Sequence, residues 1–389
     1  MNLLVVFIGL IFSSLSFAAA YTPHDDGQVL EQLPTVATAV NSDLRQLRAA
    51  LNAQPQQLEL AVRLAQRYIA LGKAEGDPRF YGYAQGVLQP WWDKPQTPSE
   101  VLLLRALILQ QRHDFDSALQ SLDALLRREP KNVGAWRIQA VIFLVRARYD
   151  EAQRSCLPLV SLDTPLSAST CLASVGSLTG QGENSYRFLQ SALADAQQVV
   201  PEQQLWALMV LADMASRLGK ANEAEHYFQQ ALQVQTPDVY LLAAYSDFLL
   251  DQHRPAEVVA LLAERRRVDG LLLRLALAKQ QLGDAQLADV VAELSARFAA
   301  SRMRGEGVHQ GDEARFTLDL LHHPEQAVPL AVSNWAAQRE PKDARIVLEA
   351  ALAAHNTAAA QPVLAFLAKT KLESVQLQHL QKAWANQHP

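Results

Sequence analysis

The residues of this chain whose side chains could carry out chemistry do not fall into a catalytic pattern. The ten histidines include no HExxH pair, in which two imidazoles one helical turn apart would bind a metal ion. His322 and His323 are adjacent, so on a helix their side chains would diverge by about 100°. There is also no GxSxG nucleophile turn and no GxxxxGK[ST] phosphate-binding loop. The sequence therefore predicts a protein that is not an enzyme, with no metal and no cofactor.

Small residues recur along the chain at the spacing of a helical repeat. Six of them form one column: Ala106, Ala140, Ser174, Ala212, Ser246 and Ala276. Successive members are 34, 34, 38, 34 and 30 residues apart, and a period near 34 is the length of one helix–turn–helix unit. A small side chain lets two antiparallel helices cross closely, so the column predicts a series of helical hairpins.

One stretch of the sequence resembles a known repeat closely. The segment WRIQAVIFLVRARYDEAQRSC, which begins at Trp136, resembles a tetratricopeptide repeat. This resemblance implies an all-α fold, a right-handed helical-repeat solenoid of antiparallel helix pairs that binds partners and seldom catalyses reactions. An irregular all-helical bundle with accidental spacing is the alternative.

The repeat register divides the chain into five segments. These are a signal peptide at 1–20, a linker at 21–39, a solenoid at 40–298 that starts with a capping helix, a glycine-rich interrupting loop at 299–312, and further repeat units with a final capping helix at 313–389. A solenoid can reach this length because each unit packs only on its neighbours.

The N-terminal segment predicts export. Residues 3–15 are almost entirely apolar, and small residues follow at 16 and 18–20, as in a secretory signal peptide cleaved near residues 18–20. The apolar run is too short for a membrane span, so we expect no stable span after cleavage. No Lys or Arg precedes the run, which leaves an uncleaved anchor as the alternative. Resemblance to exported bacterial repeat proteins implies the periplasm.

The chain contains two cysteines, Cys156 and Cys171. In the repeat register Cys156 lies in a second helix and Cys171 near the start of the next first helix, about equally far from the turn that joins them. Mirror positions of an antiparallel hairpin face each other, so an oxidising compartment would permit a disulfide. Two buried thiols that pack as small apolar residues are the alternative.

Composition bounds the partners. The net charge is −5, and charged residues make up only 19% of the chain. Because nucleic-acid binding needs a clustered positive field, we expect no nucleic-acid partner.

The resemblance also indicates a binding surface. In tetratricopeptide proteins the exposed faces of the first helices line a concave groove. Carried over by register, the groove positions are Arg137, Trp206, Met209, Asp213, Arg217, Tyr240 and Asp247. Aromatic rings and a thioether would supply apolar area, and the charges would fix the orientation of a peptide or protein partner. Packing of Trp206 and Met209 against an adjacent helix is the alternative.

A second candidate surface lies around the predicted loop and the segment that follows it. Its members are Arg302, Arg304, His309, Trp335 and Arg339. The alternatives are a solvated connector and ordinary helix-end chemistry, since Pro341 and Asp343 suit the first turn of a helix.

These observations predict a non-catalytic scaffold or adaptor that binds a peptide or protein in its concave groove, in a process of the cell envelope. One alternative is a structural subunit that assembles through its ends or its convex face. Another is an enzyme that uses residues 299–345. The sequence does not fix the partner, the pathway or the oligomeric state.

Overall fold

The computed structural model describes residues 38–304 and 310–387. The chain forms two compact units, residues 1–46 and 47–389, and helix α1 (Thr38–Ala53) crosses their boundary. The predicted signal peptide and all but the last two residues of the predicted linker lie outside the described residues. All helices after α1 belong to the second unit.

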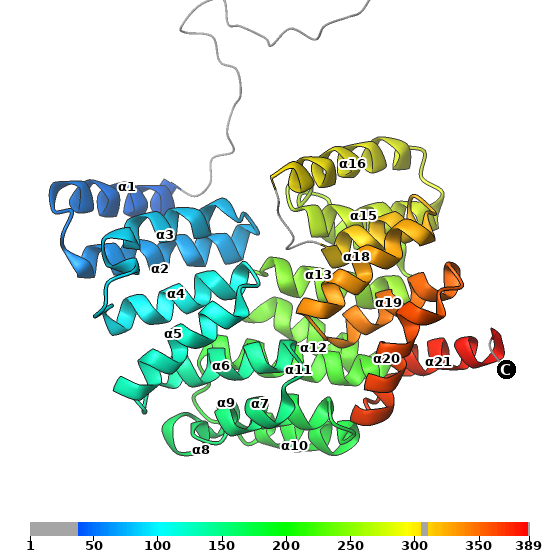
Figure 1. Ribbon diagram of the computed structural model, residues 1–389, viewed down its shortest axis with the longest axis horizontal. Coiled ribbons are helices and arrows are strands. Elements are labelled where there is room, and N and C mark those ends of the chain that lie inside the picture. Colours follow the sequence, from blue (N-terminus) through cyan, green and yellow to red (C-terminus); the bar gives the residue numbers. More distant parts are fainter. Residues whose placement is uncertain (1–37, 305–309, 388–389) are drawn as a thin grey trace, which may run out of the picture. The chain divides into compact units, whose positions relative to one another are not determined.

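The second unit is a series of helical hairpins (Figure 1). The first helices of the hairpins are α2 (Leu58–Glu75), α4 (Ser99–Gln111), α6 (Val133–Val145), α9 (Pro165–Ser177), α11 (Pro201–Arg217), α13 (Val239–Asp251), α15 (Asp269–Leu282), α17 (Gln310–Asp319) and α19 (Pro341–Ala353). The second helices are α3 (Arg79–Trp92), α5 (Phe115–Arg128), α7 (Tyr149–Cys156), α10 (Gly182–Ala194), α12 (Ala221–Val234), α14 (Pro255–Leu262), α16 (Leu287–Met303), α18 (Pro324–Ala337) and α20 (Thr357–Thr370). A short helix α8 (Leu159–Leu162) follows α7, and α21 (Val375–Gln387) ends the array.

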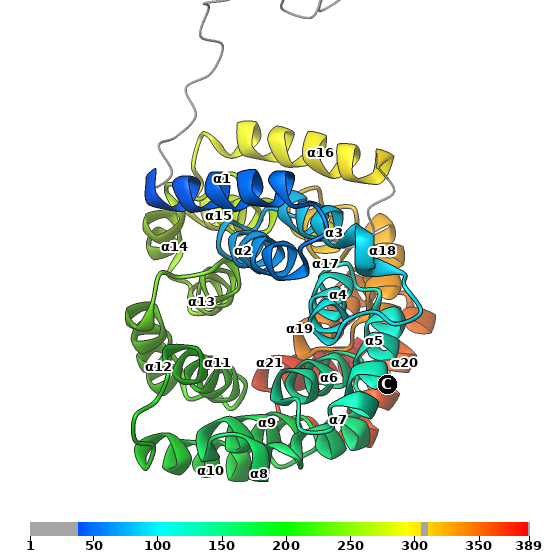
Figure 2. The same ribbon diagram turned by 90° about the vertical axis from the view of Figure 1, so that its left-hand side faces the viewer.

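The described residues contain no strand, and the predicted all-α solenoid is confirmed. In Figure 2 the first helices α4, α6, α11 and α13 lie toward the inside of the array, and the second helices α5, α7, α12 and α14 lie outside them.

The column of small residues lies where the helices cross. Five of its six members are fully buried, namely Ala106, Ala140, Ala212, Ser246 and Ala276. The sixth, Ser174, is only half-buried, because α9 and α10 approach each other at Gly176 instead. A methyl group on Gly176 would come within 2.4 Å of the Ser185 hydroxyl. Close helix crossing therefore explains the column, with one local shift.

A second column of residues lies in the turns inside the hairpins. Each of these turns holds one residue in the left-handed backbone region, which glycine adopts without strain and other residues adopt at a cost. Glycine takes the position at Gly180, Gly219 and Gly283, whereas His113, Ala147, His253, His322 and His355 have φ between 51° and 58°. Four of the histidines in the described ranges are thus turn residues. Histidine tolerates this region better than most side chains.

The predicted interrupting loop at 299–312 is wrong in its extent. Helix α16 continues to Met303 and α17 begins at Gln310. The prediction gave weight to the glycines, but the first of them is Gly305, and the preceding Ala299–Met303 contains only residues compatible with a helix. The predicted cap at the C-terminal end corresponds to α21.

Cys156 and Cys171 form a disulfide in the structure. Their Cα atoms are 5.6 Å apart, and both side chains are fully buried. The bond joins α7 to α9 and so links two neighbouring hairpins. Of the two arrangements that the sequence left open, the structure has the bonded one.

The solenoid is wound tightly enough that its later part stacks on its earlier part. The backbone N–H of Arg339 donates to the carbonyl of Val145, the last residue of α6, over 2.7 Å. The Gln338 amide hydrogen-bonds the His113 imidazole of the α4–α5 turn over 3.0 Å. Gly180, in the α9–α10 turn, faces Lys371, because a Cβ on Gly180 would lie 3.0 Å from the Lys371 Cβ.

The hairpin turns of the early repeats thus contact the segments that precede later helices. The α2–α3 hairpin at the start of the array makes contacts of the same kind. Lys73 of α2 pairs with Asp238 over 3.4 Å, and Gly76 lies against Val239 and Val268, at the starts of α13 and α15. These turns must therefore stay compact.

We expect Ala147→Gly to stabilise the protein by on the order of 0.5–1 kcal/mol, because glycine removes the left-handed strain at this turn. Urea unfolding followed by circular dichroism measures the difference. Ala140→Gly, in the interior of the same hairpin's first helix, is the matched control and should destabilise by about 1 kcal/mol or more. A loss of stability in Ala147→Gly would contradict the turn geometry.

Candidate functional site

The inner faces of four successive first helices meet in one cavity of about 550 Å³, which we call the inner channel. Helices α13, α15, α17 and α19 line it. Its charged lining residues are Asp251, Arg315, Asp319, Arg345 and Glu349, and Leu277, Gln280, Gln281 and His322 contribute apolar and polar surface. The channel is therefore polar, in contrast to the apolar seams between the hairpins.

Two arginines hold Asp247, which lies one turn before Asp251 on α13. Arg274 of α15 donates to one carboxylate oxygen of Asp247 over 2.7 Å, and Arg315 of α17 donates to the other over 2.5 Å. Arg274 also donates to Asp312 over 3.2 Å. Burial alone would raise the pKa of Asp247, but the two guanidinium groups hold it well below its ordinary value. Asp247 thus ties α13 to both following hairpins.

A second ion pair joins α13 to the last hairpin. Arg345 of α19 donates to Asp251 over 2.7 Å and to Glu349, one turn further along α19, over 2.7 Å. Each group in this cluster has a partner of opposite charge. The wall of the channel is consequently fixed by ion pairs between different hairpins.

Asp319 is the carboxylate of the channel with the weakest pairing. Its nearest cationic partner is Arg315, whose Nε lies 3.6 Å away, beyond ordinary hydrogen-bond length. Its side chain is still 35% exposed, and burial raises the pKa of the carboxyl group. A cationic group that entered the channel would find its best site here.

The residues predicted for the concave groove do not form one surface. Asp247 is not a lining residue of the inner channel but pairs with Arg315, which is, and Asp251, one turn along the same helix, lines the channel. Arg137 instead pairs with Asp163 through its Nε over 2.7 Å. Trp206 and Met209 each pack against an apolar cluster, as their alternative interpretation held.

Three further predicted groove residues lie elsewhere. Arg217 is buried and donates to the backbone carbonyls of Ser177 and Glu373 over 3.1 and 3.2 Å. Asp213 accepts from Arg217 Nε over 2.9 Å. Tyr240 is 60% exposed, and the Lys342 ammonium lies 6.0 Å from its ring centre. Arg217 therefore anchors the segment before α21 and is not open to a partner.

The second candidate surface is likewise divided. Trp335 is buried and packs edge-on against Phe366 with ring centres 5.1 Å apart, while Arg339 lies over the Trp335 ring. Arg302 pairs with Glu313, and Arg304 is an exposed residue at the end of α16. His309 lies outside the described residues. Here the structure favours packing over a site.

Helix-end chemistry accounts for the polar residues near Pro341. Asp343 accepts from the Glu340 backbone N–H over 3.0 Å and from the Asn334 amide over 2.8 Å, which closes the first turn of α19. These residues serve the helix and not a ligand.

Sequence reasoning missed Arg315, Asp319 and Glu349 as members of the site. A signal existed, because Arg315–Asp319 and Arg345–Glu349 are opposite charges four residues apart on predicted helices. Only the winding of the solenoid shows that both pairs face the same channel.

Two further properties concern the described residues alone. None of their helices is long and apolar enough to cross a membrane. No group of histidine, cysteine and carboxylate side chains in the described ranges is arranged to hold a metal ion.

Similar solved structures are helical-repeat proteins. A tetratricopeptide repeat protein from Parabacteroides merdae shares 15% identity, with 61% of this chain and 92% of that chain covered and a TM-score of 0.45. PilW, a type IV pilus biogenesis factor, shares 20% identity over 52% of this chain and 94% of its own, with a TM-score of 0.41. The human IFIT1 dimer, solved with m7Gppp-AAAA, shares 13% identity over 90% and 87%, with a TM-score of 0.47.

No protein-family model matches the sequence, and no curated protein matches it. The chain has the tetratricopeptide-like solenoid fold that its sequence predicted, and the likeness to these structures extends to the fold alone. The expectation of no nucleic-acid partner stays a prediction from net charge.

We expect Asp247→Asn to destabilise the protein at pH 7 by on the order of 2 kcal/mol, because two charge-assisted hydrogen bonds weaken. The depressed pKa means that this contribution is complete above the unfolded-state pKa of about 3.9 and is lost as the pH falls through the folded-state value. The difference from wild type should therefore shrink below about pH 4.

Urea unfolding at pH 7 and at pH 3.5 measures this dependence. Asp213→Asn is the control, because the Asp213 side chain is 60% exposed and its substitution should cost less than about 1 kcal/mol. A difference for Asp247→Asn that does not change with pH would contradict the assignment.

Proposed function

We propose that this protein is a non-catalytic scaffold that binds a partner protein by holding a polar segment of it in the inner channel. The observation that carries the proposal is the convergence of four first helices on one charged cavity, in which Asp319 has only a distant cationic partner. Helical-repeat scaffolds bind extended partners along such inner faces.

The arrangement of charges favours a segment with a basic side chain. Asp251 and Glu349 are already engaged by Arg345, whereas the Asp319 carboxylate is still partly exposed in the channel. A lysine or arginine of the partner would compensate the Asp319 carboxylate in a partly desolvated site, where a charge pair is stronger than in water. The ion pairs between the hairpins hold the site in place, which lowers the entropic cost of binding.

The channel offers little for covalent chemistry. The histidine that lines it, His322, occupies the strained turn position after α17, and Asp251, Glu349 and Arg345 are engaged with each other. This supports a binding role over the enzyme alternative.

We also propose that the protein acts outside the cytoplasm, in the bacterial periplasm. The apolar run at 3–15 with its following small residues supports export, and the Cys156–Cys171 disulfide fits an oxidising compartment. N-terminal sequencing of the mature protein tests this, and a chain that still begins at Met1 would contradict cleavage.

The binding proposal predicts that filling the channel weakens capture of a basic peptide. Gln281 lines the channel and is exposed, so Gln281→Trp should place an indole in the cavity and weaken binding by about tenfold or more, which is 1.4 kcal/mol. Fluorescence anisotropy measures binding of a labelled Ala–Lys repeat peptide, with an Ala–Glu peptide of equal length for comparison.

The design separates the channel from the rest of the surface. Gln233→Trp, on the outward helix α12, is the matched control and should bind like wild type. Asp319→Asn should also lower affinity for the basic peptide while circular dichroism stays unchanged. Equal binding by all variants, or a preference for the acidic peptide, would overturn the proposal.

A further inference from the structure

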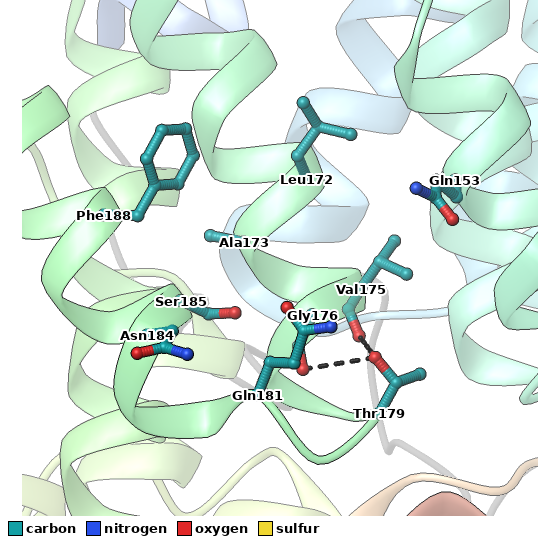
Figure 3. Close-up of a pocket in the computed structure, with 10 residues that line it drawn as sticks. All are labelled: Gln153, Leu172, Ala173, Val175, Gly176, Thr179, Gln181, Asn184, Ser185 and Phe188. Carbon is teal, nitrogen blue, oxygen red and sulfur yellow. Dashed lines mark hydrogen bonds between the residues drawn. The ribbon is translucent and has the colours of Figure 1, made fainter.

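A second cavity lies away from the inner channel, between the α6–α7 hairpin and the α9–α10 hairpin (Figure 3). We call this cavity, of about 290 Å³, the outer pocket. Gln153 of α7 borders one side, Leu172 of α9 lies above, and the start of α10 supplies Gln181, Asn184, Ser185 and Phe188. The disulfide between α7 and α9 fixes the two walls relative to each other.

The lining of the outer pocket carries no charged side chain. Its polar groups are the amides of Gln153, Gln181 and Asn184 and the hydroxyls of Thr179 and Ser185. Among the ionisable residues that adjoin lining residues in sequence, Glu183 pairs with Arg187 over 3.0 Å and with Lys220 over 3.3 Å. A charged ligand would lose its hydration here without gaining a counter-charge, so the pocket selects against ions.

The Ser185 hydroxyl lies on the wall of the pocket. Ser185 is only 7% exposed as a residue, and it is one of the pocket's lining residues. The oxygen lies in a gap that exists because residue 176 is glycine, where a methyl group would come within 2.4 Å of it. A serine hydroxyl can both donate to and accept from a ligand hydroxyl. The Thr179 hydroxyl, also in the lining, donates to the Val175 carbonyl over 3.1 Å (Figure 3).

An aromatic ring borders the same space. Phe188 is 49% exposed although it is a large apolar side chain, and Leu172 lies across from it (Figure 3). A ring face beside a set of amide and hydroxyl groups can pack against the C–H face of a ligand whose rim makes hydrogen bonds.

We propose that the outer pocket binds a neutral saccharide unit. A sugar ring has an apolar C–H face for Phe188 and hydroxyl groups that both donate and accept, which matches amides and a serine hydroxyl. An extended peptide fits less well, because the pocket has neither a sheet edge nor a charged clamp. The cavity is also at the small end for ligand sites, which suits one or two rings. This site is independent of the inner channel and adds a ligand to the scaffold.

Saturation-transfer NMR and calorimetry on the full chain test the proposal with maltotriose and chitotriose as neutral probes. Wild type should bind at least one of them, and Phe188→Ala and Ser185→Ala should each weaken that binding about tenfold or more. Digalacturonate, which is acidic, should bind at least tenfold more weakly than the neutral probe. Tyr240→Ala removes another exposed ring and is the matched control.

The remaining outcomes overturn the proposal. One is that neither neutral saccharide binds, and another is that both variants bind it as wild type does. The others are that the acidic saccharide binds equally well, or that a neutral Ala–Gln peptide binds in place of the saccharides. Circular dichroism of each variant confirms that its fold is intact. Binding of the basic peptide in the inner channel should be the same in Ser185→Ala and wild type, so failure here is distinguishable from failure of the scaffold proposal.

Discussion

Contact between successive windings of the solenoid is the constraint on which the rest of the second unit depends. The early hairpin turns receive the segments that precede later helices, through the Arg339–Val145 backbone bond, the close approach of Gly180 to Lys371 and the bond from Arg217 to the Glu373 carbonyl. Only compact turns permit this approach. In the α4–α5 and α6–α7 hairpins, which make such contacts, the turn residues His113 and Ala147 accept left-handed backbone conformations although they are not glycine.

Tight winding also brings charged inner faces together. Helix α13 meets α17 through Asp247 and Arg315, and it meets α19 through Asp251 and Arg345. Buried ion pairs add little net stability over apolar packing, but removing one partner is costly. Their effect is therefore to fix which helices face each other. The same pairing leaves Asp319 as the carboxylate available to a ligand.

The sequence predicts the local structure well and the site poorly, for a physical reason. The small-residue column and the turn positions follow from packing inside one hairpin, and the pairing of Cys156 with Cys171 follows from the geometry of neighbouring hairpins. Arg217 and Trp206 share the register of groove residues, yet one anchors the segment before α21 and the other packs in an apolar cluster. The environment of such a residue depends on how far the solenoid winds. That winding is the sum of small rotations between successive hairpins, added over many units.

The most direct test of this account is a double-mutant cycle between Asp251 and Arg345, which lie 94 residues apart in the chain. The free energy of unfolding is measured for wild type, Asp251→Asn, Arg345→Gln and the double variant. If α13 and α19 face each other across the inner channel, the two substitutions should be non-additive by on the order of 1 kcal/mol or more. Strictly additive effects would show that the two side chains do not meet, and would contradict the winding that creates the channel.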